Sequence, residues 1–292
     1  MGSDALERVP PPAEVAFETQ SRLRHGVKRL IINPLANYLP AGLLRWVLRV
    51  TRSELAAANW YDPGGWRSMV ISYEPECPQI ADKVLVAAGT VPMALRNRKR
   101  LAAHLMARLI ERAAEQQPGH PVHVLCLGAG PGQIIGEALS QTSAPAHATL
   151  VDISADAFAF GRELAARRGL GDRMKFVQAD VRDLHDYLSD PPHVVKMLGI
   201  CEYLSDDQIV TIARAASELM PRHGAIIFNS LSDAHGTDRF FRRVFGLHMI
   251  YRTPEALCEL MGRAGIGEFR ARAEPLGVYH VIVGRKVARV GA

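Results

Sequence analysis

Three glycines at alternate positions could form a binding turn for a nucleotide-like ligand. Gly128, Gly130 and Gly132 follow a run of strand-forming residues and precede a helical pattern. Because glycine has no Cβ, such a turn can adopt positive φ and lets a ligand approach the backbone. The free amides at the start of the following helix would face the same point. We therefore expect these glycines and Ala129 to contact the ligand.

The spacing of this turn differs from that of two common phosphate sites. Gln133 stands where the dinucleotide fingerprint G-x-G-x-x-G requires its last glycine. The sequence also contains no G-x-x-x-x-G-K-[ST] motif, so a P-loop that binds phosphates is excluded. The ligand is thus predicted to resemble a nucleoside without the usual phosphate cradle.

Two acids follow the next two predicted strands. Asp152 comes twenty residues after Gly132 and could accept hydrogen bonds from both ribose hydroxyls. Asp180 follows the third strand, and its short carboxylate suits an adenine amino group. After the fourth strand, the backbone from Gly199 to Cys201 would pass beside the reactive end of the ligand. Ligands of open parallel sheets bind beyond the carboxyl ends of the strands, so these residues should converge.

The elements that position these residues alternate between strand and helix. The sequence predicts strands at 122–127, 148–151, 174–178, 194–198, 225–230, 269–273 and 279–285. Helices are predicted between them, at 134–139, 155–168, 206–220 and 254–264. The fold class is therefore α/β, with a Rossmann-like sheet of seven strands. The sheet is expected to be mostly parallel, with an antiparallel terminal strand and helices on both faces.

The N-terminal third is predicted to be a helical addition to this fold. Residues 1–20 contain a triple proline and are expected to form a flexible arm. Residues 21–94 are predicted to form a helical cap or lid, with one amphipathic helix over 41–58. A longer helix over 91–114 leads into the ligand-binding domain, which is assigned to residues 95–292.

Bulk properties limit the function classes. The net charge of +5 over 292 residues is too small and too scattered to indicate nucleic-acid binding. The four cysteines lack C-x-x-C spacing, and the N-terminus lacks a signal-peptide pattern, so we expect a cytoplasmic protein. The apolar stretch over 30–50 is broken by prolines and carries arginines, which makes it a poor membrane span. Peripheral membrane contact and a homodimer both stay open.

The strings LGAGPG, VDIS, QADV and LGICEYL, with the antiparallel strand at the end, resemble class I S-adenosylmethionine-dependent methyltransferases. The resemblance covers about residues 95–287, and LGICEYL is similar to a sparsely characterised bacterial group of such proteins. It implies S-adenosylmethionine as cofactor, with its methionine part against the glycine turn. Asp152 and Ile153 would then hold the ribose, and Asp180 and Val181 the adenine. Arg96 would bind the carboxylate of the cofactor; a solvated helix face is the alternative.

Methyl transfer requires few catalytic groups. It is an in-line displacement, and a general base is needed only when the nucleophile arrives protonated. His235 is the first candidate base and Glu202 the second; a structural histidine and a helix-stabilising acid are the alternatives. Cys201 could be a nucleophile, although a buried cysteine is usually apolar filler. Asp233, His235 and Asp238 form the pattern D-x-H-x-x-D, which could hold a divalent cation. No metal is predicted, because the fourth strand does not end in the Asp that a metal site shared with the fifth strand would need.

Aromatic residues predict the kind of acceptor. Tyr61, Trp66 and Tyr73 lie in the cap, and Phe241 lies in an apolar segment after the fifth strand. Surface turns and core packing are the alternative explanation for them. We expect a small, apolar or aromatic metabolite, methylated on oxygen, nitrogen or carbon. The alternatives are an enzyme that uses the same cofactor for a cyclisation or rearrangement, and a non-catalytic binding module.

Overall fold

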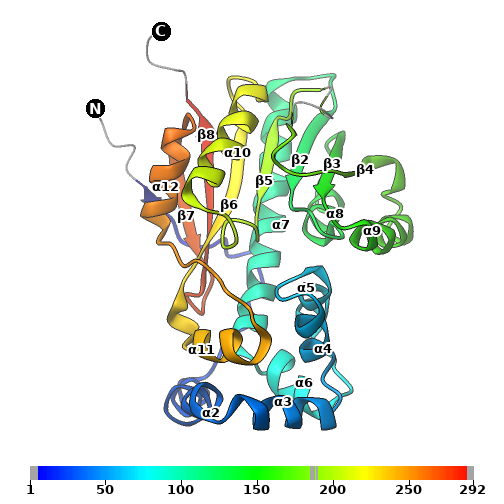
Figure 1. The fold of residues 1–292 in the computed structure, drawn as a ribbon. Helices are drawn as coiled ribbons and strands as arrows, with labels where there is room; N and C mark the ends of the chain where they lie inside the picture. Colours follow the sequence, from blue (N-terminus) through cyan, green and yellow to red (C-terminus); the bar gives the residue numbers. More distant parts are fainter. Residues whose placement is uncertain (1–5, 185–187, 189, 288–292) are drawn as a thin grey trace.

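We describe the protein from a computed structural model that covers residues 6–184, 188 and 190–287. Residues 1–5 of the expected arm and 288–292 of the expected domain lie outside the described residues. The centre of the fold is one mixed sheet with the strand order β1-β7-β8-β6-β5-β2-β3-β4 (Figure 1). Its strands are β1 Glu7–Arg8, β2 Val122–Leu127, β3 Ala146–Asp152, β4 Met174–Gln178, β5 Val194–Met197, β6 Ala225–Leu231, β7 Ile266–Ala273 and β8 Tyr279–Lys286.

The sheet confirms the predicted α/β class and corrects the number of strands. Strands β2 to β6 run parallel, and β8 is antiparallel to both β6 and β7. The eighth strand is the two-residue β1, which pairs parallel with β7 at the sheet edge. Glu7 and Arg8 are both exposed and polar, so no hydrophobic pattern could predict this strand. An ion pair of 2.7 Å between Glu7 and Arg270 accompanies the pairing.

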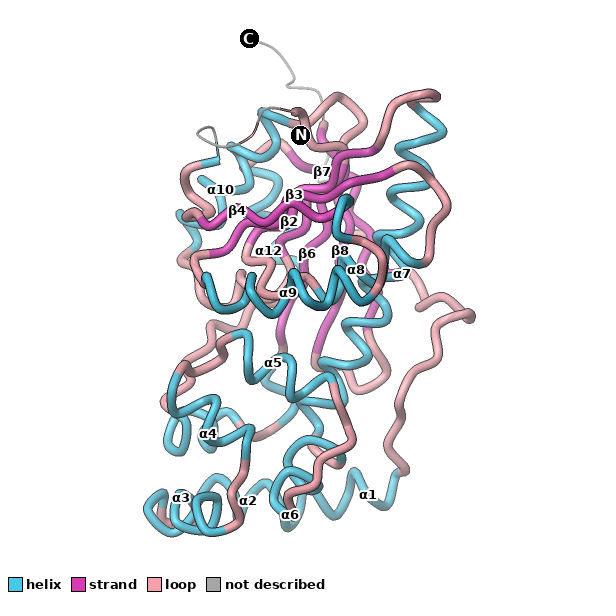
Figure 2. Tube along the Cα trace, turned by 90° about the vertical axis from the view of Figure 1, so that its right-hand side faces the viewer, coloured by secondary structure: helices cyan, strands magenta, loops and turns pink. Residues whose placement is uncertain are grey.

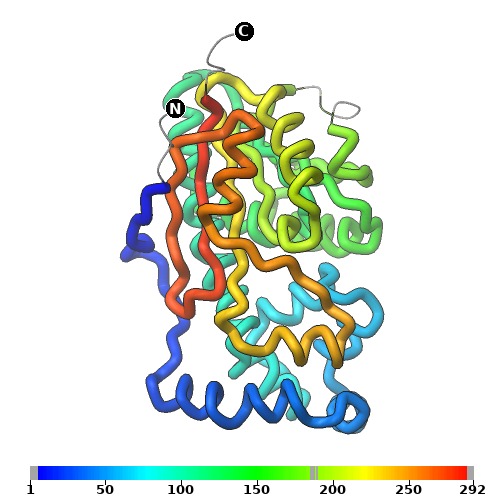
Figure 3. Tube along the Cα trace, turned by 60° about the vertical axis from the view of Figure 1, so that its left-hand side comes forward, coloured from blue at the N-terminus to red at the C-terminus, as the bar shows by residue number. Residues whose placement is uncertain are grey.

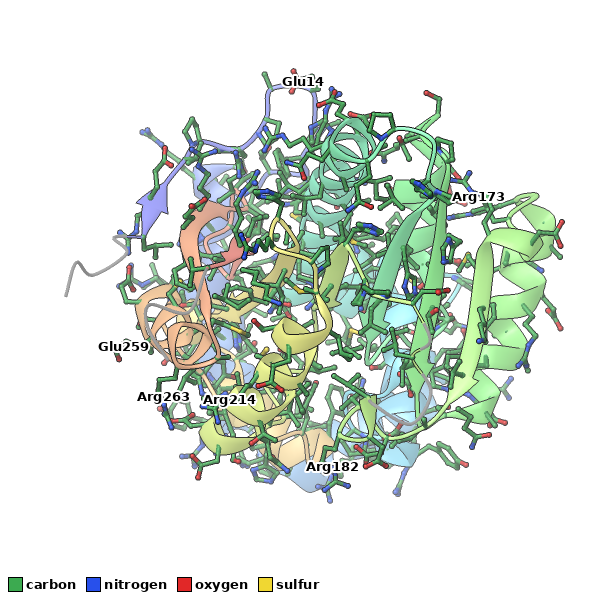
Figure 4. The ribbon with its side chains drawn as sticks, turned by 90° about the horizontal axis from the view of Figure 1, so that it is seen from above. Glu14, Arg173, Arg182, Arg214, Glu259 and Arg263 are labelled. Carbon is green, nitrogen blue, oxygen red and sulfur yellow. The ribbon has the colours of Figure 1, made fainter. Side chains whose placement is uncertain are left out.

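Helices cover both faces of the sheet, as expected for parallel strands whose residues are apolar on both sides. Helices α7, α8 and α9 pack on one face and α10 and α12 on the other, each over a separate apolar core (Figures 2 and 4). These helices are α7 Thr90–Gln116, α8 Gln133–Ser140, α9 Ala155–Arg167, α10 Asp206–Leu219 and α12 Pro254–Arg263. A capping box starts α10, with the Ser205 and Gln208 side chains bonded to each other's backbone amides.

The remaining helices form a cap at one end of the sheet (Figure 1). They are α1 Arg22–Val27, η1 Lys28–Ile32, α2 Asn33–Tyr38, α3 Ala41–Val50, α4 Glu54–Tyr61, α5 Trp66–Tyr73, α6 Ile80–Asp82 and η2 Lys83–Ala87. The short helices η5 Asp233–His235, α11 Asp238–Phe240 and η6 Phe241–Phe245 join them from the segment after β6, and η3 Gly171–Arg173 precedes β4. A third apolar core lies inside this cap.

The helix predicted over 41–58 is two helices, α3 and α4. Arg52 between them adopts a φ of 52°, which a helix cannot continue. Ser53 then caps α4, because its hydroxyl accepts a hydrogen bond from the amide of Ala56. The same hydroxyl donates to the buried Asp82 at 2.6 Å. The backbone of Arg52 thus ends α3, and the side chain of Ser53 starts α4.

Helix α7 belongs to both parts of the molecule. Its residues Ala94 and Leu95 lie in the core of the cap, and Leu101 and Ile110 lie in a core of the sheet. In Figure 1 it runs continuously from the cap along the sheet. The expected boundary between residues 94 and 95 therefore falls within one unbroken helix.

Candidate active site

A cavity of about 650 Å³ lies between the carboxyl ends of the strands and the cap. The turn after β2 and the segments after β3, β4 and β5 line it from the sheet side. Helices α4 and α5 and the segment that includes η6 line it from the cap side. The volume is in the range of small-ligand sites.

The glycine turn lies in this cavity as the sequence predicts. Gly128 and Gly130 have φ of 56° and 53°, a region that residues with a side chain rarely adopt. A Cβ on Gly128 would collide with the side chain of Ile200. The turn therefore requires glycine both for its conformation and for close packing. Gly130, Ala129 and Gly132 also line the cavity.

The two predicted acids lie on the same cavity. Asp152 accepts hydrogen bonds from the amide of Gly130 at 2.8 Å and from that of Ser154 at 3.0 Å. It thereby joins the glycine turn to the segment after β3. Asp180 lines the cavity too and forms an ion pair with Arg182, and the Arg182 guanidinium hydrogen-bonded to it lowers the pKa of this carboxyl. The predicted cofactor residues Ile153, Val181 and Gly199 line the same cavity.

Three polar side chains, which we call the buried polar cluster, lie between the glycine turn and the cap. They are Arg98 of α7, Glu202 after β5 and Asn229 of β6, and all are at least nine-tenths buried. Arg98 forms a 3.6 Å ion pair with Glu202 and lies 3.5 Å from the side-chain oxygen Oδ1 of Asn229. That oxygen also accepts a hydrogen bond from the amide of Gly199 at 2.9 Å.

The buried polar cluster contains atoms that lack a partner within the described residues. These atoms are Arg98 Nε, Glu202 Oε2 and Asn229 Nδ2. Buried polar atoms are rarely left without a hydrogen bond, because the loss of solvation costs about 1–3 kcal/mol per group. Arg98 and Glu202 also line the cavity. Arg98 and Glu202 are therefore suited to bind polar groups of a ligand.

A buried lysine adds a second cation to this region. Lys196 of β5 lines the cavity, and its Nζ lies 3.5 Å from the carbonyl oxygen of Gly128 and 3.4 Å from that of Leu198. Burial lowers the pKa of this lysine. Burial also raises the pKa of Glu202, although the nearby Arg98 opposes this shift. The region thus combines two basic side chains with one carboxyl whose ionisation is disfavoured.

Arg96 does not lie in the cavity, so its predicted role is wrong. Its guanidinium donates to both carboxylate oxygens of Glu18 and to the carbonyl oxygens of Ser72 and Val86. A helix turns by about 100° per residue, so two positions along α7 face nearly opposite directions. Arg98 therefore reaches the cavity, whereas Arg96 ties α7 to the N-terminal segment.

His235, the first candidate base, also lies away from the cavity. It is 3% exposed, and its ring nitrogens contact the Thr237 hydroxyl at 2.8 Å and the Tyr251 hydroxyl at 3.2 Å. Its carbonyl oxygen accepts a hydrogen bond from Asn33 in α2. Burial lowers the pKa of His235 to about 4, and nearby Asp238 and Asp233 oppose the shift. The residue therefore joins the segment after β6 to the cap and is not the base.

His235 should instead affect stability in acid. Its pKa is about 4 in the folded protein and about 6.5 when unfolded, so its stabilisation is present above pH 6.5 and is lost as the pH falls toward 4. Between pH 7 and 5 this loss is about 2 kcal/mol. We expect the free energy of unfolding of His235→Gln to decrease less between pH 7 and 5 than that of the wild type. Urea unfolding at the two pH values measures this difference. The exposed His248→Gln is the control and should follow the wild type. Equal acid sensitivity of both variants would contradict this role.

Two further predicted residues do not line the cavity. Cys201 is 2% exposed and packs in the core under α10, with its Sγ 3.7 Å from the carbonyl oxygen of Met197. The side chain of Cys201 thus faces the core although the neighbouring Ile200 and Glu202 face the cavity. Tyr61 is 78% exposed at the end of α4, because the helix stops there and its ring points to solvent. Trp66, Tyr73 and Phe241 do line the cavity, as predicted.

The acidic and histidine residues considered for a metal have other contacts. Asp238 accepts hydrogen bonds from the Tyr251 hydroxyl at 2.7 Å and from Arg242 at 2.8 Å. Among the described residues there is no group of three or more His, Cys, Asp or Glu side chains that could hold a metal ion.

Arg98 and Lys196 line the cavity although neither was predicted from the sequence, and Asn229 is buried next to Arg98. Asn229 had a visible signal, because it is the first polar residue after the apolar start of the strand AIIFNSL. Lys196 stands out in the same way in the strand VVKM. Polar residues inside strands that are buried on both faces need a partner, so each of them could have been assigned to a site.

Comparison with known proteins supports the interpretation of this cavity. Residues 124–224 match the family model described as a methyltransferase domain. This range contains the glycine turn, Asp152, Asp180 and Glu202. No curated protein matches the chain in sequence.

Several solved structures share the fold. A "possible exported protein" from Bordetella parapertussis is 14% identical, with a TM-score of 0.65 over 76% of this chain and 79% of that one. An O-methyltransferase family protein from Burkholderia thailandensis is 16% identical, with a TM-score of 0.53 over 80% and 70%. The magnesium protoporphyrin IX methyltransferase of Synechocystis PCC 6803, with bound SAH, is 12% identical, with a TM-score of 0.53 over 89% and 99%. The predicted Rossmann-like fold is thus confirmed.

Proposed function

We propose that this chain, a class I S-adenosylmethionine-dependent methyltransferase, methylates a small apolar or aromatic metabolite. One observation carries the proposal: a single cavity joins a polar end to an apolar end. The polar end contains the glycine turn, Asp152, Arg98 and Glu202. The apolar end is walled by side chains of the cap, which include Leu95, Phe241 and Met249.

The residues of the polar end fit S-adenosylmethionine. Arg98 lines the cavity and its Nε is an unpartnered donor, which suits a carboxylate, and the positive charge of Arg98 strengthens such a bond. The oxygens of Asp152 can accept from ribose hydroxyls beside the bonds they already accept. Asp180 would face the adenine. When bound there, the cofactor supplies a methyl group on a sulfonium.

The apolar end suits an acceptor that is itself apolar or aromatic. Trp66 and Tyr73 of α5 line the cavity from one side, and Phe241 of η6 lines it from another. Aromatic walls bury large apolar areas and exclude water from the region of the reaction. Exclusion of water favours transfer to the acceptor over hydrolysis.

Glu202 replaces His235 as the proposed general base. Its Oε2 atom has no partner among the described residues, and its side chain lines the cavity. Burial raises the pKa of this carboxyl, which moves it toward the range in which a base works well near neutral pH. We assign Oε2 the role of accepting the proton that an acceptor hydroxyl loses as its oxygen bonds to the methyl carbon.

We propose a cytoplasmic location on the basis of the cysteines. Cys77, Cys126, Cys201 and Cys258 all carry free thiols, which is typical of a reducing compartment such as the cytoplasm. None of the helices in the described ranges has both the length and the apolar character that crossing a membrane requires.

The experiment is incubation of the purified chain and methyl-labelled S-adenosylmethionine with a metabolite extract, followed by mass spectrometry. A metabolite that gains one labelled methyl group supports the proposal. Conversion of a metabolite at unchanged mass would instead support a cyclisation or rearrangement. Calorimetry with S-adenosylmethionine and S-adenosylhomocysteine distinguishes the remaining alternative, because a chain that binds neither would be a non-catalytic module.

A further inference from the structure

The segment from residue 19 to 53 differs in charge from the rest of the chain. It contains seven Lys and Arg residues and no Asp or Glu, whereas the whole chain has a net charge of only +5. The rest of the chain therefore carries a net charge of −2. In Figure 3 this segment runs as a row of helices along one end of the molecule, away from both termini. We call this row, α1 to α3, the basal helices.

The basal helices also hold most of the exposed apolar side chains. Eleven of the seventeen large apolar residues that are exposed in the described part of the chain lie between Leu23 and Val50. Helices α1, η1 and α2 have no buried residue at all. They are attached to the body largely by polar contacts, such as those of Asn33 and Asn37 with the carbonyl oxygens of His235 and Gly236. Their apolar side chains are left facing outward.

Helix α3 has two apolar faces. Ala41, Leu44 and Leu48 pack into the core of the cap. The second face repeats at positions i, i+3, i+4 and i+7 and points to solvent, and it consists of Leu43, Trp46, Val47 and Val50. Trp46 is 60% exposed and Val50 is 61% exposed, so this face has no partner within the described chain.

We propose that the basal helices are a docking surface for an anionic lipid membrane. An amphipathic helix binds a membrane when an apolar face enters the interface and Lys or Arg residues meet anionic headgroups. Tryptophan is favoured at that interface, where Trp46 would lie. No ion pair within the described ranges involves Arg22, Arg24 or Arg29, so their charges are not neutralised by the protein.

The charge of the surface decides between a membrane and a second copy of the chain. A two-fold dimer would place the same basal helices against each other, because its two surfaces are identical. Each copy would bring seven positive charges and no acid in this segment, so the contact would be repulsive. A nucleic acid would neutralise the charges but would leave the apolar stripe of α3 exposed. An anionic lipid surface satisfies both the charges and the apolar side chains.

The test is co-sedimentation of the full chain with vesicles. One set consists of equal parts phosphatidylcholine and phosphatidylglycerol, and the other of phosphatidylcholine alone. We expect binding to the anionic vesicles, weaker binding at high salt, and much less binding to the neutral vesicles. Brominated lipid should quench the fluorescence of Trp46 in a variant whose other tryptophans are phenylalanine. This assay needs neither cofactor nor acceptor, so it is independent of the proposed methyl transfer.

Matched variants make the test specific. Arg29→Glu and Trp46→Ser should each weaken vesicle binding by about tenfold or more, while circular dichroism stays unchanged. Arg263→Glu, on the exposed end of α12 (Figure 4), makes the same charge change away from the basal helices and should bind as the wild type does. Equal loss in the Arg263 variant, equal binding to both vesicle types, or a dimer that protects Trp46 would overturn the proposal. Heparin binding that is insensitive to Trp46→Ser, with no vesicle binding, would point instead to a nucleic acid and would also overturn it.

Discussion

Replacing Glu202 with glutamine is expected to lower kcat by about 10²–10⁴-fold, the usual contribution of a general base. Glutamine keeps the shape of the side chain and an oxygen that can accept from Arg98, but it cannot take up a proton at neutral pH. The affinity for S-adenosylmethionine, measured by calorimetry, should change much less than kcat. A proportional loss of affinity would assign Glu202 to cofactor binding and would contradict the role of base.

The pH dependence of kcat provides a second measurement on the same variant. Only the ionised form of Glu202 can accept a proton, and burial raises the pKa of this carboxyl. The kcat of the wild type should therefore rise with pH as Glu202 ionises and then reach a plateau. The Glu202→Gln variant should lack this rise. His235→Gln serves as the control, because that histidine lies outside the cavity and its loss should leave the shape of the profile unchanged.

Replacing Asp152 with asparagine is expected to weaken S-adenosylmethionine binding by about 100-fold or more, because hydrogen bonds to a charged group contribute about 1.5–3 kcal/mol each. Asn retains one acceptor oxygen, whereas the Asp152 oxygens accept separately from the amides of Gly130 and Ser154. The variant would thus lose a ribose acceptor and loosen the glycine turn. Calorimetry with S-adenosylhomocysteine measures the same loss without turnover.

Asp156→Asn is the matched control for Asp152→Asn. Asp156 lies four residues further along the chain, and its side chain is 68% exposed and pairs with Arg67 at 3.4 Å. Because exposed ion pairs contribute little, this variant should bind the cofactor as the wild type does. Equal affinities of the two variants would show that Asp152 has no particular role in cofactor binding.

The sequence predicted which residues at the strand ends line one cavity, for a topological reason. Residues that directly follow parallel strands must meet at one edge of the sheet, whatever the details of packing. Gly130 and Asp180 follow strands and Asp152 ends one, so their chain positions alone bring them together. The β-strand pattern that identifies these ends depends only on apolar runs and on the residues that terminate them.

Side chains that reach the cavity from other elements could not be placed in this way. The choice between Arg96 and Arg98 depends on the rotation of α7 about its axis, which is set by packing against the cap and the sheet. His235 follows β6 at a suitable distance, but the segment after β6 turns toward α2 and α11, and Thr237 and Tyr251 occupy its ring nitrogens. Tertiary contacts of this kind leave no local signal in the sequence.

The unbroken course of α7 restricts how an acceptor can enter. Arg98 lies at the midpoint between the part of α7 held by the cap and the part held by the sheet. A swinging motion of the whole cap would have to bend a 27-residue helix or drag the guanidinium away from Glu202. We therefore expect a bulky acceptor to enter by local displacement of α5 and of the glycine-containing loop before it. Arg98 would keep its position while this entrance opens.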